Sequence, residues 1–304
     1  MQGSKISYRR TRLAPTPSGY LHVGNLASFI LTAGLARRFG ASILLRIDDL
    51  DRDRYRVEYA EDIFSTLRFL GIPWDEGPRD VTDFEQRFSQ MSRLMMYMEH
   101  LDYLAYNDLI FTCSCTRSSS GVHGEGCSGK CARARLPLTH EDVSWRLRSE
   151  PEITHNEVIK IYELDQKVKQ FHLPSEMCQI QVRRKNGLPS YHLASLSDDT
   201  HYGVDLIVRG EDLLESTVMQ MHLANVLGAT DFERVAFVHH PLVLGVEGEK
   251  LSKTAGSESI YSMRKEGLGV GLIFNRILKS AGIEGQADNW EDCFAEIAKK
   301  WGFN

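Results

Sequence analysis

The 304-residue chain contains few cysteines and no long hydrophobic run. Six cysteines are too few for a disulfide scaffold in a chain of this length, so any cluster of them points to metal ligands or reactive thiols. No apolar stretch approaches the ~18 residues that a membrane span requires. The start of the chain, MQGSKISYRRTRLAP, also lacks the apolar centre of a signal peptide. We therefore expect a cytoplasmic protein with no membrane partner.

A large excess of charge of one sign is missing as well. The 36 lysines and arginines and the 41 aspartates and glutamates leave a net charge of −5. This balance argues against a protein that coats nucleic acid without regard to sequence, although a local basic face can still bind phosphates. With 42% hydrophobic and 25% charged residues, the composition is that of a globular protein, and the length favours about two domains.

Hydrophobic periodicity predicts alternating strands and helices before Cys113. A strand ends near Ala14, and a helix follows the turn PTPSGYLHVGN and ends at Gly40. A buried strand and two more helices are expected next, at Ser42–Ile47, Ile63–Gly71 and Phe84–Met98. The alternation predicts a parallel, doubly wound α/β sheet.

The periodicity fades from Cys113 to about Pro174, so we interpret that stretch as an insertion that splits the sheet. The elements expected beyond it are strands at Tyr191–Leu196, Val204–Val208 and Val235–Val238 and helices at Leu213–Leu227, Leu268–Ala281 and Asn289–Trp301. The expected division of the chain is a first half-sheet at 1–112, the insertion at 113–174, a second half-sheet with a lysine-containing loop at 175–255, and a short helical region at 256–304.

The segment PSGYLHVGN lies where the first strand passes into the first helix, at the sheet edge where open α/β proteins bind ligands. Gly19 and Gly24 let a ligand approach the backbone, and the amides and dipole of the following helix favour a phosphate. His22 adds a further hydrogen-bond donor. The alternative interpretation is an ordinary glycine turn with a surface histidine.

A second segment, EGEKLSKTAGS, carries Lys250 and Lys253 in a glycine-flanked loop after the last expected strand. A lysine on a flexible stem can follow charge onto a departing pyrophosphate, which is electrostatic catalysis of phosphoryl or nucleotidyl transfer. The alternative interpretation is a solvated loop.

A cluster of four cysteines opens the insertion: Cys113, Cys115, Cys127 and Cys131. They form two pairs, with one and three intervening residues, and eleven residues separate the pairs. Four closely spaced thiolates suit a tetrahedral structural zinc ion, and unpaired thiols are the alternative. Cys178 and Cys293 lie outside this spacing and are expected to be ordinary buried residues.

In this order around a split sheet, the two segments resemble the HIGH and KMSKS signatures of class I aminoacyl-tRNA synthetases. Five sequence segments narrow the resemblance to the glutamyl-tRNA synthetase group: RLAPTPSGYLHVGN, LLRIDDLDRDR, SYHLASLSDD, LIVRGEDLLEST and HHPLVLGVEGEKLSK. Full-length enzymes of that group continue into a large helical anticodon-binding part, whereas this sequence stops soon after the lysine loop. It therefore resembles the truncated paralogues, the glutamyl-queuosine tRNA(Asp) synthetases.

The resemblance implies a Rossmann-like class I catalytic domain, split by a zinc-containing insertion and followed by a short helical appendage. It implies ATP with magnesium and L-glutamate as ligands, with His22 and Lys253 as catalytic residues. The residues implied for ATP are Gly19, His22, Gly24, Asn25, Lys250 and Lys253. Those implied for glutamate are Arg12, Ala14, Thr16, Asp48, Tyr191 and Arg209. The paralogues usually have three cysteines and a tyrosine in the insertion, and Cys127 stands at the tyrosine's position.

Glutamate recognition requires partners for two carboxylates and one ammonium group. By resemblance, Arg12 and Arg209 bind carboxylates through their planar forks, and Asp48 binds the ammonium group. Asp48 replaces the usual glutamate of the family with a side chain one methylene shorter. A closer backbone, a bridging water or a different preferred amino acid would each accommodate the change. Alternatively, the two arginines form ion pairs with Asp48, Asp49 or Glu211.

The resemblance implies that the α-carboxylate of glutamate attacks the α-phosphorus of ATP without tRNA, giving glutamyl-adenylate and pyrophosphate. Glutamate then passes to queuosine in the anticodon loop of tRNA(Asp), and the protein is a monomer. Two alternatives stay open: a minimal glutamyl-tRNA synthetase that charges a tRNA 3′ end, and a non-catalytic RNA-binding paralogue.

Two charged stretches complete the sequence analysis. Aspartates and arginines alternate over residues 49–54, which we interpret mainly as solvated charges. Six basic residues either contact RNA phosphates or form an ordinary solvated surface: Lys130, Arg133, Arg135, Arg183, Arg184 and Lys185.

Overall fold

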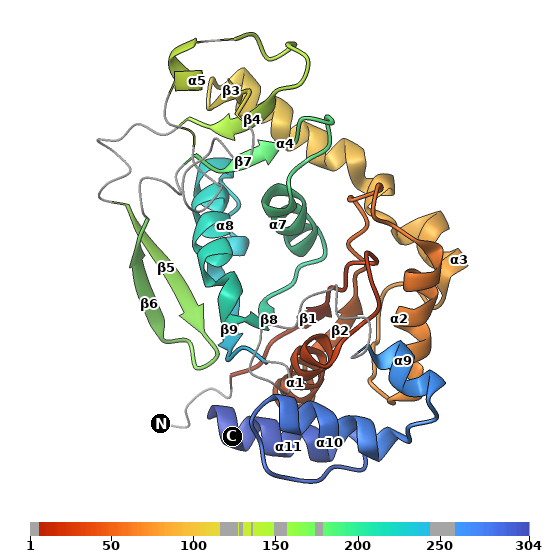
Figure 1. The fold of residues 1–304 in the computed structure, drawn as a ribbon. Coiled ribbons are helices and arrows are strands. Elements are labelled where there is room, and N and C mark those ends of the chain that lie inside the picture. Colours follow the sequence, from red (N-terminus) through yellow and green to blue (C-terminus); the bar gives the residue numbers. More distant parts are fainter. Residues whose placement is uncertain are drawn as a thin grey trace. The chain divides into compact units, whose positions relative to one another are not determined.

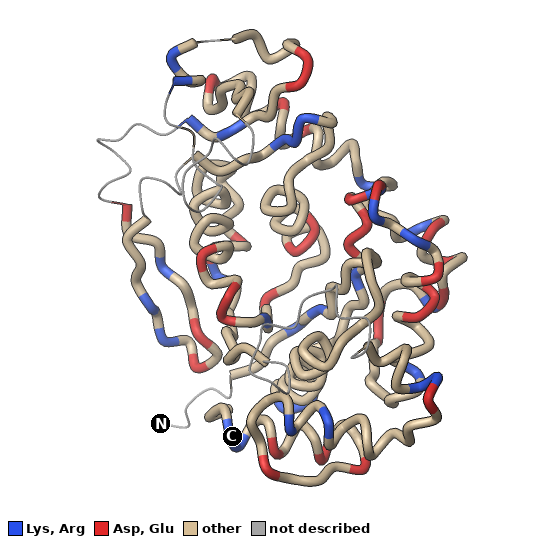
Figure 2. Tube along the Cα trace, in the orientation of Figure 1, with Lys and Arg blue, Asp and Glu red and all other residues tan. Residues whose placement is uncertain are grey.

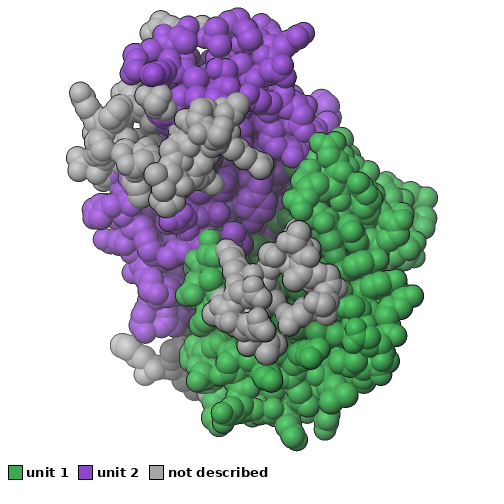
Figure 3. Space-filling view, viewed as in Figure 1, with its two compact units in different colours: residues 1–92, 204–212, 237–304 green, residues 93–203, 213–236 purple. Residues whose placement is uncertain are grey.

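The computed structural model describes residues 6–115, 127, 130–134, 136–148, 157–173, 179–243 and 259–303. The chain divides into two compact units, which Figure 3 shows in different colours. Unit 1 contains residues 1–92, 204–212 and 237–304, and unit 2 contains residues 93–203 and 213–236. The four segments expected from the sequence have other limits, and that division stays a prediction.

Unit 1 draws its strands from both sides of the expected insertion (Figure 1). Its strands and first helix are β1 (Arg10–Leu13), α1 (Val23–Phe39), β2 (Ser42–Leu45), β8 (Leu206–Gly210) and β9 (Ala236–His240). β1 and β2 pair in parallel, and β8 is the sheet neighbour of β9. The amide N–H of Asp205 donates to the carbonyl oxygen of Arg10 at 3.0 Å, which places the start of β8 beside β1. The prediction of a split α/β fold is therefore confirmed.

The helices of unit 1 cover α1 and the strands. They are α2 (Val57–Phe69), α3 (Val81–Asp83), α9 (Ile260–Lys265), α10 (Val270–Ser280) and α11 (Trp290–Trp301). α10 and α11 contact α1 and confirm the expected helical appendage. Gly34 in α1 permits the close approach of α11, because a Cβ atom at this position would lie 2.0 Å from the ring of Phe294.

Unit 2 combines two antiparallel arrangements with helices. Its strands are β3 (Ile110–Cys113), β4 (Ser144–Leu147), β5 (Val158–Glu163), β6 (Val168–His172) and β7 (Gln181–Arg183). Its helices are α4 (Leu94–Tyr106), α5 (Lys130–Ala134), α7 (Tyr191–His201) and α8 (Leu214–Leu227). β3, β4 and β7 form one antiparallel sheet, while β5 and β6 form a hairpin that contacts α8.

The prediction of a strand at Tyr191–Leu196 is wrong, because these residues begin helix α7. The Ser190 hydroxyl accepts the amide N–H of Leu193 at 3.3 Å and so caps the helix. The short apolar run of this segment does not distinguish a buried strand from a helix, whereas the serine cap does.

The helix expected at Phe84–Met98 is also interrupted. A π-helical turn spans Phe84–Phe88 and a 3₁₀ turn spans Gln90–Arg93, so α4 begins only at Leu94. The interruption has a cause in buried polar contacts. The carboxylate of Asp49 accepts the Ser89 hydroxyl at 2.6 Å and the Gln90 amide N–H at 2.7 Å.

Asp49 also corrects the interpretation of residues 49–54 as solvated charges. Figure 2 shows acidic and basic residues interspersed around α2 and α3, and Arg52, Asp53 and Arg54 are exposed as expected. Asp49, however, is only 1% exposed and binds Arg52 at 2.5 Å.

Among the described residues, no helix is both long and apolar enough to cross a membrane.

Candidate active site

The turn before α1 is held by reciprocal hydrogen bonds between His22 and Asn25. Nδ1 of His22 accepts the amide N–H of Gly24 at 3.2 Å, and Oδ1 of Asn25 accepts the amide N–H of His22 at 3.1 Å. These contacts satisfy amides that the first turn of a helix leaves without intrahelical partners. Because Nδ1 accepts, the neutral ring carries its proton on Nε2 and can donate it to an anion. The turn thus combines a helix N-terminus with an oriented imidazole donor.

The chain returns to this turn just after the lysine loop. His22 and Ser259 form an antiparallel β-bridge, and the amide N–H of Ile260 donates to the carbonyl oxygen of Leu21 at 2.8 Å. The rings of Tyr20 and Tyr261 stack with their centroids 4.1 Å apart. The first described residues after the loop are therefore fixed beside His22.

Several residues to which the sequence analysis assigns a role lie outside the described residues. These are Lys250 and Lys253 in the loop, Arg135 among the basic residues, and Cys178. The roles of the two lysines stay predictions.

Arg12 and Asp48 lie at the carboxyl ends of β1 and β2. Arg12 is 5% exposed, and its Nη1 donates to the carbonyl oxygen of Val208 in β8 at 3.3 Å. The amide N–H of Asp48 donates to the carbonyl oxygen of Pro15 at 2.9 Å. This hydrogen bond places Asp48 beside the segment that contains the predicted residues 14 and 16.

Arg209 directly follows the residue that Arg12 contacts. Its side chain is 4% exposed, and its guanidinium lies 5.1 Å from the centre of the Phe237 ring. The structure thus brings Arg12, Asp48 and Arg209 to the ends of the strands of unit 1. Tyr191 belongs to unit 2, where it is half-exposed at the start of α7.

Arg46 is the residue that the sequence analysis missed. Its Nε and Nη2 donate to Oδ1 and Oδ2 of Asp48 at 2.7 and 3.0 Å, and both side chains are at most 10% exposed. The two parallel hydrogen bonds fix the plane of the carboxylate. A carboxylate offers about four lone-pair positions, so one carboxylate can accept from a guanidinium and from an ammonium group together. An arginine at the end of an apolar strand, two residues before an aspartate, was the available signal.

The four cysteines of the insertion converge in unit 2. The sulfur atoms of Cys113, Cys115, Cys127 and Cys131 all lie within 4.8 Å of one another. Sγ of Cys115 lies 3.8 Å from Sγ of Cys127 and 3.6 Å from Sγ of Cys131. Four sulfurs bound at ~2.3 Å to one tetrahedral zinc ion lie ~3.8 Å apart, so the donor set and its spacing fit zinc. Cys293 is buried elsewhere, as expected.

Two thiols of this cluster, Cys115 and Cys131, have pKa values that are shifted in opposite directions. Burial raises the pKa of Cys115 to about 12, and its neighbouring thiols add to that effect. Burial also raises the pKa of Cys131, but hydrogen bonds from the Ser114 amide and the other thiols outweigh it and lower the value to about 7. Of these two thiols, Cys131 is therefore the one that ionises first.

Basic residues surround this cysteine cluster. Nζ of Lys185 donates to the carbonyl oxygen of Ser114 at 3.0 Å, next to two of the cysteines. Lys130 and Arg133 are exposed on α5, and the Arg183 guanidinium lies 4.7 Å from the centre of the Trp145 ring. Exposed cations of this kind can bind RNA phosphates.

Comparison with known proteins assigns the class of this chain. The family described as "tRNA synthetases class I (E and Q), catalytic domain" matches residues 9–118 and 153–287. The chain belongs to this family and is therefore a ligase of the aminoacyl-tRNA synthetase class with a Rossmann-like catalytic domain.

Within that class, the resemblance to glutamyl-queuosine tRNA(Asp) synthetases is confirmed. The chain is 34% identical to "Glutamyl-Q tRNA(Asp) synthetase" of Nitratidesulfovibrio vulgaris, over 90% of this chain and 86% of the relative. It is 36% identical to the protein of the same name from Methylococcus capsulatus, over 83% of this chain and 78% of the relative. "Glutamate--tRNA ligase" of Coprothermobacter proteolyticus is 32% identical, but only 59% of its length is covered.

Solved structures support the fold. A glutamate-tRNA synthetase from Elizabethkingia anophelis has a TM-score of 0.70 at 21% identity, covering 95% of this chain and 66% of that chain. A glutamate tRNA ligase from Elizabethkingia meningosepticum, in complex with its amino acid, has a TM-score of 0.64 at 22% identity. That alignment covers 86% of this chain and 54% of the other.

Proposed function

We propose that this chain activates glutamate with ATP and then transfers it to queuosine in the anticodon loop of tRNA(Asp). In the first step, an oxygen of the glutamate α-carboxylate attacks the α-phosphorus of ATP. The bond to the bridging oxygen breaks, and pyrophosphate leaves with the electron pair. In the second step, a hydroxyl of the modified base attacks the acyl carbon and releases AMP. The observation that carries the proposal is the capped His22 turn at the strand ends where Arg12 and Arg209 lie.

Positioning and charge stabilisation account for most of the catalysis in this proposal. His22 donates from Nε2 to a phosphate oxygen, and the first amides of α1 complete the anion site. Gly19, Gly24 and Asn25 shape the turn, and magnesium with ATP neutralises further phosphate charge.

Lys250 and Lys253 are the cations that this proposal assigns to the triphosphate. Chain connectivity limits how far Lys253 can lie from Ser259, which pairs with His22, since six residues span at most about 22 Å. The proposed role of Lys253 is to follow charge onto the departing pyrophosphate.

Glutamate selection in this proposal depends on arginines and one aspartate. Arg12 and Arg209 bind carboxylates, Tyr191 adds a hydrogen bond, and Ala14 and Thr16 border the amino acid. Asp48, held by Arg46, accepts from the ammonium group. Its short side chain leaves room for a bridging water.

We further propose that the four cysteines hold one structural zinc ion. Zinc would supply no chemistry to the reaction and would fix β3 and α5 together. The basic residues of this region, including Arg184, then present contacts for RNA phosphates. A monomeric state and a cytoplasmic location stay predictions.

The experiment that tests the acceptor is transfer of labelled glutamate to purified tRNAs under mildly acidic conditions that preserve the ester. We expect labelling of tRNA(Asp) that carries queuosine and none of tRNA(Asp) that lacks it. Labelling of tRNA(Glu) at its 3′ end would instead support a minimal glutamyl-tRNA synthetase.

An assay of the first step alone distinguishes the proposed activity from a non-catalytic RNA-binding paralogue. We expect glutamate-dependent exchange between ATP and pyrophosphate without added tRNA, and weaker or no exchange with aspartate and glutamine. Absence of exchange with all three amino acids would contradict the proposed activity.

A further inference from the structure

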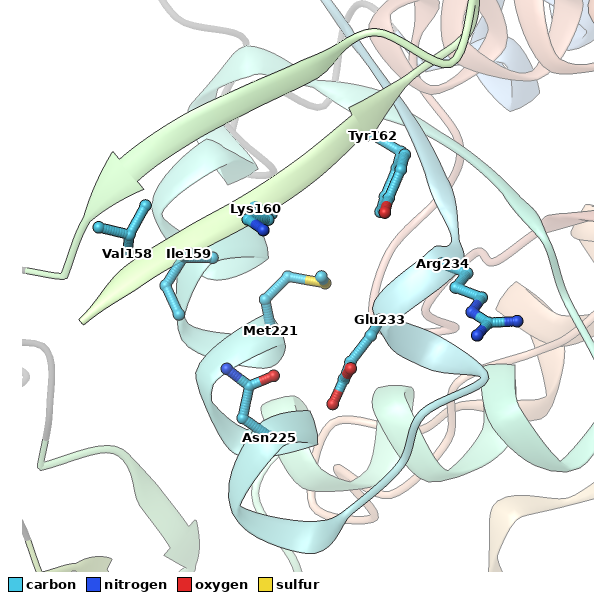
Figure 4. Close-up of a pocket in the computed structure, with 8 residues that line it drawn as sticks. All are labelled: Val158, Ile159, Lys160, Tyr162, Met221, Asn225, Glu233 and Arg234. Atoms are coloured by element: carbon cyan, nitrogen blue, oxygen red, sulfur yellow. The ribbon is translucent and has the colours of Figure 1, made fainter.

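Unit 2 contains a cavity that the proposed reaction does not use. Its volume is about 360 Å³, and β5, α8 and the turn after α8 line it (Figure 4). All of its lining residues belong to unit 2. The volume lies at the lower end of the range for small-molecule sites, ~300 to 1,000 Å³.

Two hydrogen-bond acceptors face each other across one side of this cavity. Nδ2 of Asn225 donates to Oε1 of Glu157 at 3.1 Å, so the amide is oriented and its oxygen is left to accept. Figure 4 shows that oxygen on the side of Glu233, whose carboxylate points toward it. The site can therefore receive a group with adjacent N–H donors.

Lys160, Tyr162 and Arg234 provide hydrogen-bond donors and an aromatic ring to the same cavity. Lys160 and Arg234 are exposed cations, and Tyr162 offers an aromatic face on the same side of β5 as Lys160. Among the described residues, the side chains of these three and of Glu233 make no hydrogen bond or ion pair with one another or with any neighbour. Within the described part of the chain, four polar groups that line one cavity are thus available to a ligand.

Apolar contacts complete the cavity. Met221 is 3% exposed and Ile159 is 1% exposed, and both contribute to the lining. A flat ring can contact these two side chains while its edge meets the acceptors.

We propose that this cavity binds a guanine nucleotide. The Watson–Crick edge of guanine carries two adjacent donors, N1–H and N2–H, which match the Glu233 carboxylate and the Asn225 oxygen. Adenine and cytosine present one amino donor beside an acceptor, and uracil presents one ring N–H, so each pairs less well with two acceptors. Lys160 and Arg234 then contact the phosphate. The source is either single-stranded RNA, which rests on the proposed function, or a free nucleotide.

The test is calorimetric titration of the full chain with the four nucleoside 5′-monophosphates, at a saturating concentration of a non-hydrolysable ATP analogue. We expect guanosine monophosphate to bind at least about fivefold more tightly than the others. Glu233→Gln should abolish that preference, because it replaces one acceptor with a donor. The matched control, Glu215→Gln on the exposed side of α8, should leave it unchanged.

A second titration distinguishes the two sources. An RNA pentanucleotide with guanosine at its centre and two uridines on each side should bind more tightly than free guanosine monophosphate. Lys160→Ala should reduce that difference in affinity, and Lys167→Ala should leave it unchanged. Equal affinity of the two ligands would overturn the RNA source and assign a free nucleotide. No preference for guanine, or a preference that survives Glu233→Gln, would overturn the site.

Failure of this proposal is distinguishable from failure of the proposed function. Pyrophosphate exchange by Glu233→Gln should equal that of the unsubstituted chain, since Glu233 is not part of the proposed catalytic machinery. Binding is measured without turnover, so a chain that lacks exchange activity still tests the cavity.

Discussion

At the scale of single residues, the buried pair of Arg46 and Asp48 is the contact that shapes the proposed amino-acid site. Arg46→Lys removes the planar fork and leaves one flexible ammonium group against the carboxylate. We expect a loss of about 1 to 3 kcal/mol in the free energy of unfolding, because a buried carboxylate loses hydrogen bonds. We also expect a several-fold higher KM for glutamate with little change in the KM for ATP.

The matched control for this substitution is Arg52→Lys. Arg52 pairs with the buried Asp49, but its own side chain is 43% exposed, so water compensates for the lost fork. Denaturant unfolding and exchange kinetics measure both variants. A KM for glutamate that rises equally in the two variants would contradict a specific role for Arg46.

Local chemistry explains which site residues the sequence predicts. His22 and Gly24 lie at a strand-to-helix turn, and the four cysteines are spaced as metal ligands are. Their positions in the sequence were therefore enough to predict both sets of residues. Arg46 could not be predicted in this way, because its role depends on a partner that only the folded backbone brings into register. The burial of Asp49 was unpredictable for the same reason, because its partners Ser89 and Gln90 are distant in the sequence.

At the scale of secondary-structure elements, Glu157 attaches the β5–β6 hairpin to α8. Its Oε2 lies 2.8 Å from Nδ1 of His222, and its Oε1 accepts from Asn225. Burial raises the pKa of Glu157, but the nearby imidazole of His222 and the hydrogen bond from Asn225 outweigh it and place the pKa below its ordinary value. A carboxylate with a lowered pKa stabilises the fold above the unfolded-state pKa, and the effect disappears as the pH falls through the folded-state value.

Glu157→Gln should therefore cost about 1 kcal/mol of unfolding free energy at pH 7 and much less below about pH 4. Glu163→Gln is the control on the same hairpin, because its pair with Lys169 is on the surface. Urea unfolding at the two pH values measures the difference. A cost that does not shrink with falling pH would contradict the ionic attachment.

The cysteine cluster supports a separate prediction for β3 and α5. The purified chain should contain about one zinc ion, as four thiolates of this spacing require. A strong chelator or Cys127→Ser should release it and lower hydrogen-exchange protection around β3 and α5. Cys293→Ala, which removes a buried thiol outside the cluster, should leave the zinc content unchanged. Full protection in a zinc-free chain would contradict a structural metal.

The prediction of elements succeeded where one strong signal dominated. Gly40 and Gly228 end α1 and α8, as expected. The limits of the amphipathic helices α10 and α11 lie within two residues of those expected. It failed at α7, where a short apolar run obscured the Ser190 cap. It also failed at Phe84–Met98, because tertiary contacts to Asp49 interrupt a helix that periodicity alone continues.

At the scale of the whole molecule, the fold makes the site from sequence segments that lie far apart. Unit 1 takes strands from before, between and after the two segments of unit 2, and the chain returns to His22 at Ser259. Strand periodicity predicted this split, since the interruption after Cys113 is followed by further strands. The ion pairs and the cavity of unit 2 were not predictable, because they require side chains from separate elements.

The most direct measurement is glutamate-dependent exchange between ATP and pyrophosphate by Lys253→Ala, compared with Lys279→Ala on the exposed side of α10. If His22 and Lys253 lie on either side of the triphosphate, the Lys253 variant should lose about 100-fold or more in kcat, with the KM for ATP changed only a few-fold. The control should match the unsubstituted chain. Exchange at the full rate by Lys253→Ala would contradict the proposed site.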